Sequence, residues 1–167
     1  MSHVLPDHFL ILCFLMLLAW AACSDAIEFT IPNLASVGLA LLYPIHVLVS
    51  PIPVAWVWAS LIATAIFIPS LALFASGSFG GGDVKLLSAA ALWAGPKLIL
   101  PMLLVMSLAG GVLALVVWAA HRMRRHRVIT YGDVSLTGAA YPSPIRLPYG
   151  VAIATGAGLA GLRLLSG

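Results

Sequence analysis

The segment Phe79-Gly80-Gly81-Gly82-Asp83-Val84-Lys85 sets three consecutive glycines before a carboxylate, in a chain of 167 residues that is 62% hydrophobic and 8% charged. An acidic side chain next to sequence that spans a bilayer costs free energy, so its presence indicates a function. Glycines lack a Cβ atom and let another chain approach such an acid closely. A local explanation is also open, because Gly and Asp favour turns and Asp83 would cap the helix that follows.

The composition around this segment is that of a membrane protein. So few charged side chains would not cover a water-facing surface, whereas the apolar residues suffice for several helices of about 20 residues each. The net charge of +3 is small and is concentrated in residues 121–127, which predicts an orientation in the membrane and no nucleic-acid binding. We therefore expect an all-α, polytopic integral membrane protein with a single domain, residues 1–167, whose surroundings are the lipid bilayer.

The apolar runs predict about six transmembrane helices. The first run is interpreted as a retained helix and not as a signal peptide, since the acidic Asp7 stands where a basic region would precede a signal sequence. Bends are expected near Pro44 and Pro69, and the short fourth helix is expected to end near Gly95-Pro96. The predicted spans are Phe9–Cys23, Leu34–Val49, Val54–Phe74, Val84–Trp93, Lys97–Ala120 and Pro148–Leu165.

The basic segment predicts which side of the membrane each connection faces. Residues 121–127 lie between the fifth and sixth predicted spans and should be cytoplasmic. Counting back through the spans then places Asp83 and Asp25 at cytoplasmic helix ends as well, with both termini outside. The two acids are therefore predicted to share one side of the membrane.

Two carboxylates on one side of a membrane suggest a hydrolytic pair. When two such groups lie close together they share one proton, so the ionised acid accepts a proton from water while the other donates one to a substrate. Lys85 is placed either to stabilise the ionised Asp83 or to pair with lipid phosphate, and both remain open. Glu28 is interpreted as a solvated loop residue, with a third acid of the site as the alternative. Asp133 is interpreted as a turn residue, with a pairing to Asp83 in place of Asp25 as the alternative.

Metal and cofactor sites are not predicted. The two cysteines, Cys13 and Cys23, and the five histidines of the chain show none of the spacings of zinc ligands. We expect neither a metal nor a cofactor.

Three motifs resemble those of the prepilin peptidases, the type IV leader peptidase family of membrane aspartic proteases. The segment Gly80-Gly81-Gly82-Asp83-Val84-Lys85 matches the GxGD-x-K signature of that family. Asp25 followed by Ile31-Pro32-Asn33 resembles its first motif, and Leu147–Ala152 resembles the Pro-Tyr-Gly segment at the head of its last helix. The chain departs from the family at Ala26–Thr30, where basic residues are usual and this loop is acidic.

The resemblance implies that Asp25 and Asp83 are catalytic aspartates that remove the leader of type IV prepilins at the cytoplasmic face of the bacterial inner membrane. The chain looks like the short form associated with Flp/Tad pilus assembly, so a Flp-like prepilin is the expected partner and no N-methyltransferase domain is expected. The residues that would support the motifs are Gly80, Gly82, Lys85, Pro32, Asn33, Pro148, Tyr149 and Gly150.

A second hypothesis is a non-enzymatic membrane carrier or pilus-assembly subunit, in which the acids bind ions or cap helices. A carrier should show inverted repeats and acids near the middle of the membrane. The sequence shows no clear repeat, and its acids lie at the predicted helix ends, so the peptidase hypothesis is preferred. The pilin that is cleaved and the oligomeric state are not predicted.

Overall fold

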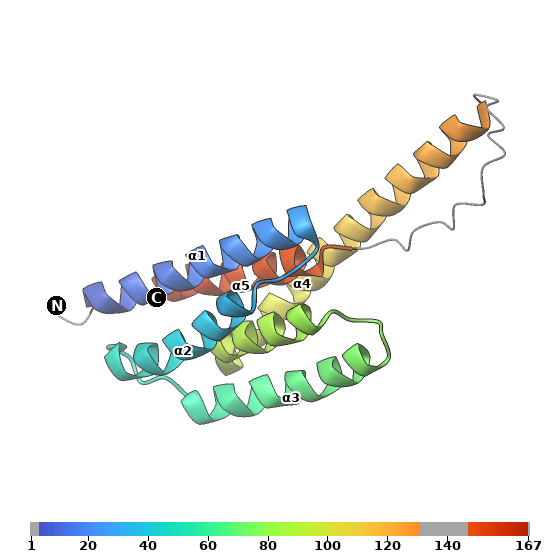
Figure 1. Ribbon diagram of the computed structural model, residues 1–167. Helices are drawn as coiled ribbons and strands as arrows, with labels where there is room; N and C mark the ends of the chain where they lie inside the picture. The colour runs from blue at the N-terminus through green and yellow to red at the C-terminus, as the bar shows by residue number, and fades with distance from the viewer. Residues whose placement is uncertain (1–3, 131–146, 167) are drawn as a thin grey trace.

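The computed structural model describes residues 4–130 and 147–166 and is all-helical in those ranges (Figure 1). The helices form an elongated bundle from which the far end of α4 extends. The described residues form five helices: α1 (Val4–Glu28), α2 (Asn33–Val49), α3 (Trp56–Ala75), α4 (Gly81–Thr130) and α5 (Tyr149–Ser166).

Four of these helices are long and apolar enough to cross a membrane, namely α1, α3, α4 and α5. Helix α2 has 17 residues and is shorter than the others. The prediction of an all-α membrane protein is confirmed, but the predicted count of about six spans is not, because the structure has five helices and four candidate spans.

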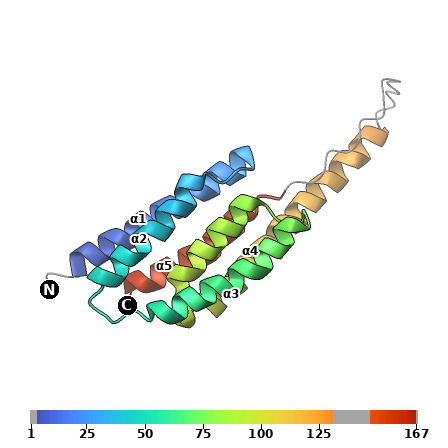
Figure 2. The ribbon, with the colours of Figure 1, turned by 60° about the horizontal axis from the view of Figure 1, so that its bottom comes forward.

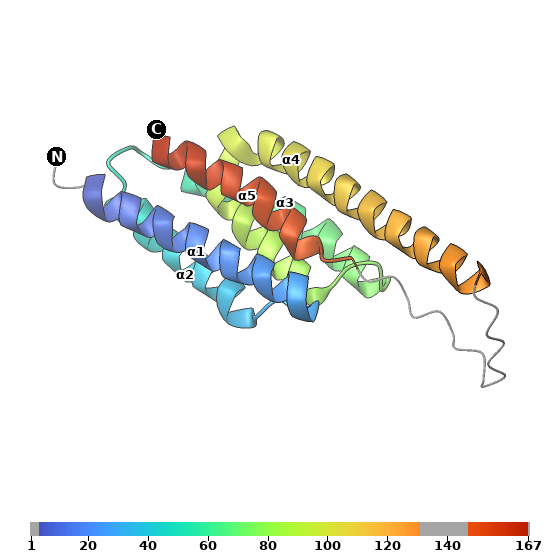
Figure 3. The same ribbon diagram turned by 90° about the horizontal axis from the view of Figure 1, so that it is seen from above.

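Gly95 explains the difference in count. The predicted helices Val84–Trp93 and Lys97–Ala120 are both parts of α4, and they meet at Gly95, whose backbone is non-helical with φ of 56° and ψ of −167°. Glycine adopts a positive φ without steric cost, and Pro96 follows it directly. The chain turns back at this point, so the first arm of α4 and the longer second arm run in opposite directions (Figure 3).

Helix ends differ from the predictions near the first acid. Helix α1 continues to Glu28, so the predicted polar break that began at Ser24 starts later and Asp25 lies in the last turn of α1. Helix α2 begins at Asn33 directly after Pro32, as expected for a proline at a helix start. Pro44 and Pro69 lie inside α2 and α3, which continue past them.

Helix α5 packs against both α1 and α4 through small residues. A Cβ atom on Gly156 would lie 3.0 Å from Cβ of Met106 on α4, and one on Gly161 would lie 2.9 Å from Cε1 of Phe14 on α1. Glycines at these positions allow close helix packing, as is usual in membrane bundles. The largest fully buried side chains are Phe14, Ile11, Leu39, Leu86, Met102 and Ile153.

The bundle has two distinct ends (Figures 1 and 2). The start of α1, the end of α5, the α2–α3 connection and the turn between the two arms of α4 lie together. The α1–α2 connection, the start of α4 and the start of α5 lie at the opposite end, which we call the carboxylate end because it holds Asp25 and Asp83.

Candidate active site

Asp25 is held by the start of α5. Its side chain is buried at 5% exposure, and the backbone N–H of Gly150 donates a hydrogen bond to its Oδ2 at 2.7 Å. The backbone N–H of Val151 also interacts with this carboxylate. The first N–H groups of a helix have no partners within the helix and favour negative charge. The last helix of the chain therefore supplies the donors for an acid at the end of the first.

Asp83 lies in the first turn of α4 and has one satisfied oxygen. The backbone N–H of Gly80 donates to its Oδ2 at 3.2 Å, which is the contact expected of an acid that caps its own helix. The other oxygen, Oδ1, is buried and has no hydrogen-bond partner among the described residues. The local explanation of Asp83 as a capping residue thus accounts for only half of its carboxylate.

Ile31 brings the two helix starts together. A Cβ atom on Gly82 would lie 2.9 Å from Cβ of Ile31, and one on Gly150 would lie 2.8 Å from Cδ1 of the same isoleucine and 2.8 Å from Oδ2 of Asp25. One side chain therefore touches the start of α4 and the start of α5. The carboxylate of Asp25 interacts electrostatically with that of Asp83. The two acids predicted from the sequence therefore lie in one site. Ile31 was quoted in the first motif but was not predicted as a contact.

The remaining motif residues surround this pair. Nζ of Lys85 donates to Oδ1 of Asn33 at 2.9 Å, which joins α4 to the start of α2 and differs from both roles considered for Lys85. Pro32 and Pro148 precede α2 and α5, and their carbonyls accept hydrogen bonds from Ala35 at 3.0 Å and Val151 at 3.2 Å.

An aromatic contact also closes this end of the bundle. The rings of Phe79, just before α4, and Tyr149, the first residue of α5, have centroids 5.7 Å apart. Tyr149 therefore packs the start of α5 against the glycine-rich connection that leads to Asp83.

Two other acids were considered for the site. Glu28 is exposed and accepts a long hydrogen bond, 3.5 Å, from Oγ1 of Thr30. Asp133 lies outside the described residues. Within residues 4–130 and 147–166, no group of three or more His, Cys, Asp or Glu side chains is arranged to hold a metal ion.

A second buried polar cluster was not predicted. At the end opposite the carboxylate end, Oδ1 of Asp7 lies 2.6 Å from Nδ1 of His46, and the His46 ring stacks on Trp93 with centroids 4.9 Å apart. These residues line a cavity of about 310 Å³ together with Tyr43, whose buried hydroxyl has no partner among the described residues. Asp7 and His46 are separated by 39 positions and share no motif. The sequence offered only an acid just before the first apolar run and a histidine within the second.

One comparison with known proteins, a family model, agrees with the motifs. Searches of curated proteins and of solved structures found no match. A family model matches residues 11–115, a range that holds most of the bundle and includes Asp25, Ile31 and the glycine-rich segment before Asp83. Because this model covers more than half of the chain, the chain belongs to the type IV leader peptidase family.

Proposed function

We propose that this protein is a membrane aspartic endopeptidase that removes the leader of type IV, Flp-like prepilins. The observation that carries the proposal is Oδ1 of Asp83, which is buried and has no partner among the described residues, in the same site as the second buried carboxylate, Asp25. A buried acid oxygen without a donor costs free energy unless it holds a proton or meets a ligand. Family membership supports a peptidase role for that oxygen.

In the proposed reaction the two acids share one proton and activate water. Asp25, which receives the α5 N–H groups, accepts a proton as the water oxygen bonds to the carbonyl carbon of the leader peptide bond. Asp83 donates its proton to the carbonyl oxygen. When the C–N bond of the tetrahedral intermediate breaks, Asp25 passes its proton to the leaving amine and one hydroxyl proton returns to Asp83. The pair is thereby restored without a metal or a covalent intermediate.

We further propose that the carboxylate end faces the cytoplasm across the inner membrane and that both termini lie outside. The basic segment 121–127 near the end of α4 supports this orientation, because cytoplasmic segments are enriched in Lys and Arg. The reversal at Gly95 supports separate crossings by the two arms of α4, which with α1, α2, α3 and α5 makes six.

The test is co-expression with the Flp-type precursor of the same organism, read as the gel shift that follows leader removal. Wild type should process the precursor, and Asp25→Asn and Asp83→Asn should each lower the rate by about 10²- to 10⁴-fold, the usual contribution of a general acid or base. Membrane levels of each variant are measured in parallel, so that loss of protein is not mistaken for loss of chemistry.

Asp133→Asn is the matched control. It removes the same charge and should process the precursor at the wild-type rate. If Asp133→Asn is inactive and Asp25→Asn is active, the pair of acids has been assigned wrongly. If wild type leaves its own precursor uncut, the peptidase proposal is wrong and the carrier or assembly-subunit hypothesis replaces it.

A further inference from the structure

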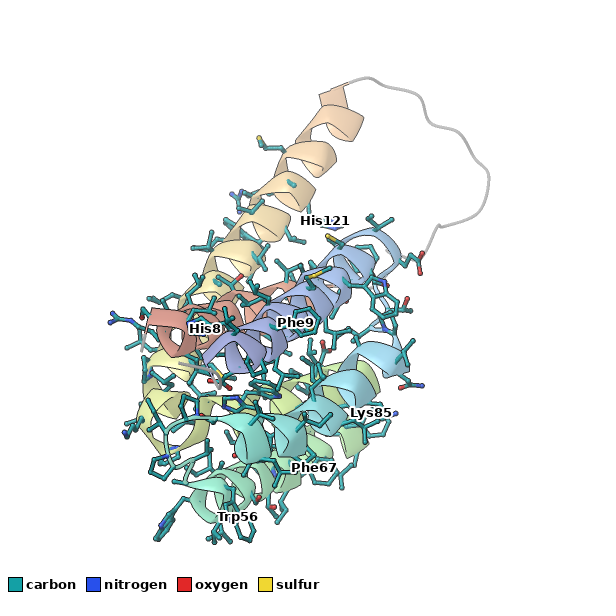
Figure 4. All side chains as sticks on the ribbon, turned by 90° about the vertical axis from the view of Figure 1, so that its left-hand side faces the viewer. His8, Phe9, Trp56, Phe67, Lys85 and His121 are labelled. Atoms are coloured by element: carbon teal, nitrogen blue, oxygen red, sulfur yellow. The ribbon has the colours of Figure 1, made fainter. Side chains whose placement is uncertain are left out.

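The cavity beside Asp7 and His46, which we call the His46 cavity, lies at the end of the bundle opposite the carboxylate end. In Figure 4 this end faces the viewer. Each of the five helices contributes to the lining, and so does the connection between α2 and α3. The volume of about 310 Å³ falls at the lower end of the range of about 300–1,000 Å³ that is usual for small-molecule sites.

His46 presents a ring nitrogen without a partner to this cavity. Its side chain is only 6% exposed, and Nδ1 is occupied by Oδ1 of Asp7. The other ring nitrogen, Nε2, has no hydrogen-bond partner among the described residues, and unlike the hydroxyl of Tyr43 it is not sealed from solvent. Because His46 lines the cavity, Nε2 is the atom that reaches it. Both nitrogens of a protonated imidazole are donors, so a ring that donates from Nδ1 to a carboxylate can donate from Nε2 to an anion.

Two cationic side chains line the same cavity. Lys97 and Arg163 are exposed, and their side chains make no hydrogen bond or ion pair with the described residues. Arg163 lies in the last turn of α5, where the helix dipole favours a cation. Lys97 instead begins the second arm of α4, directly after Gly95 and Pro96, where the dipole disfavours one. The helix that carries Lys97 therefore does not explain its charge.

The positive charge of this cavity is not balanced by the lining. Asp7 is the only acid among the lining residues, and it is paired with His46. The opposing groups are Lys97, Arg163 and the start of the second arm of α4, which also lines the cavity. The first N–H groups of a helix have no partners within it and favour an anion. Because these groups repel a metal cation and attract an anion, the His46 cavity is a candidate anion site.

The rest of the lining and its place in the bundle favour an anion with an apolar body. Most of the remaining lining residues are apolar, among them Ile11, Val54 and Leu92. Trp56 and Trp58, at the start of α3, are 57% and 64% exposed, and Trp56 marks this end of the bundle in Figure 4. Exposed tryptophans at the end of a membrane helix are typical of the level of the lipid headgroups. A ligand with an anionic head and an apolar body at that level is a lipid.

We propose that the His46 cavity binds one anionic phospholipid, whose phosphate contacts Lys97, Arg163 and Nε2 of His46 and whose acyl chain begins along the apolar lining. Hydrogen bonds from such cationic groups to a phosphate are among the strongest in proteins. The bound lipid joins α2, α4 and α5 and therefore stabilises the folded bundle. This inference goes beyond the proposed peptidase activity and does not depend on it, because the cavity lies at the opposite end from the two carboxylates.

The first experiment locates the lipid. The protein carries a photo-crosslinking residue in place of Ile52, which lines the cavity and is 61% exposed, in vesicles of equal parts phosphatidylglycerol and phosphatidylcholine. Phosphatidylglycerol should make up at least about nine-tenths of the cross-linked lipid, as expected for about tenfold tighter binding. The same residue in place of Trp58, which is exposed at the start of α3 outside the lining, should capture the two lipids equally.

The second experiment removes the groups that contact the phosphate. The affinity for phosphatidylglycerol is measured by native mass spectrometry of the protein in a neutral detergent. Lys97→Gln and Arg163→Gln should each lower it by about tenfold, because each removes a hydrogen bond to a charged group. His46→Asn keeps an amide donor for Asp7 but has no Nε2, and it should lower the affinity by several-fold. Arg122→Gln is the matched control, since Arg122 is an exposed cation outside the lining, and it should bind the lipid as wild type does.

The third experiment distinguishes a lipid from a free anion. Ala55 is exposed and lines the cavity, so Ala55→Trp should fill part of the apolar lining and lower the affinity for phosphatidylglycerol by about tenfold. Ala65→Trp, on an exposed position of α3 outside the lining, should have no such effect. Inorganic phosphate in large excess should leave the lipid bound, because it lacks the apolar body.

Two results would overturn the inference. Equal capture of the two lipids by the residue at position 52 would mean that the cavity does not distinguish headgroups by charge. If inorganic phosphate displaces phosphatidylglycerol, and Ala55→Trp binds the lipid as well as Ala65→Trp does, the cavity holds a free anion and no lipid. Neither result bears on the peptidase proposal, which is tested separately by leader removal.

Discussion

Asp7 and Asp83 are equally buried, at 9% exposure each, yet they lie at opposite ends of the bundle and differ in their surroundings. Asp7 has a side-chain partner, since its Oδ1 lies 2.6 Å from Nδ1 of His46. Asp83 receives one backbone N–H, and its Oδ1 has no partner among the described residues. Burial alone thus does not separate these two acids, but their partners differ. The carboxyl group of Asp7 is held by histidine, whereas the proposed reaction would use the unpartnered Oδ1 of Asp83 to transfer a proton.

The end of the bundle that holds Asp7 and His46 should lose more stability than the carboxylate end when a polar side chain is replaced. His46→Leu leaves Asp7 buried without a partner and should lower the free energy of unfolding by about 3 kcal/mol or more. Asp83→Asn should change it little. The measurement is thermal unfolding of both purified variants in detergent.

A double variant serves as the control for this effect. Asp7→Leu combined with His46→Phe removes both polar partners, and the new ring can stack on Trp93, so most of the lost stability should return. If His46→Leu unfolds at the wild-type temperature, the Asp7–His46 pair does not stabilise the bundle and the comparison between the two ends fails.

At the carboxylate end, a very small displacement of Asp25 or of the start of α5 should lower the cleavage rate strongly. A Cβ atom at position 150 would lie 2.8 Å from Oδ2 of Asp25, so Gly150→Ala must move the acid or the helix start. Since a displacement of about 1 Å costs roughly 100-fold in rate, this variant should be about that much slower. The measurement is the initial rate of precursor cleavage. Gly158→Ala on the same helix, where a Cβ meets nothing within 4 Å, should cleave normally. Equal activity of the two variants would show that the α5 start does not position Asp25.

The bond between Lys85 and Asn33 should contribute less. Lys85→Met or Asn33→Leu removes an exposed hydrogen bond that joins α4 to α2, and each should slow precursor cleavage about fivefold, equivalent to about 1 kcal/mol. Because the two residues act through one bond, the double variant should be no slower than the slower single variant. Fully additive losses would mean that the residues act separately.

The smallest effect is expected at Glu28. This acid is exposed in the same segment as Asp25, and Glu28→Gln should stay within about twofold of the wild-type cleavage rate, as surface substitutions usually do. The pH dependence of cleavage should also be unchanged. A large loss of activity or an altered pH profile would instead place a third acid in the site, which was the alternative considered for Glu28.

Much of the fold follows from local sequence. The long apolar runs predicted helices in the right places, and Pro32 marked the start of α2 correctly. The run that became α1 was predicted to end at Cys23, whereas the helix continues to Glu28. Hydropathy marks where lipid contact ends, but the helix extends further because its last turn is held from outside by α5 through Asp25. The pair Gly95-Pro96 predicted an interruption between two helical segments, and the non-helical backbone of Gly95 within α4 confirms it.

The site was predictable only where its signals were local. Asp25 and Asp83 stand out as acids next to apolar runs, and the glycines before Asp83 mark a close approach. The partners that build the site are distant in sequence. Ile31 meets Gly82 and Gly150 only in the folded bundle, and Lys85 bonds to a residue 52 positions away. Contacts of this kind depend on how helices pack, which periodicity does not encode.

The hydrogen bond between Gly150 and Asp25 joins residues 125 positions apart, and this has a consequence for biogenesis. A ribosome adds about 5–20 residues per second, so on the order of ten seconds separate the synthesis of the acid from that of its donor. During this interval the nascent chain holds Asp25 without the N–H groups of α5. The proposed active site is therefore complete only after the last helix, α5, has been synthesised and has packed against α1.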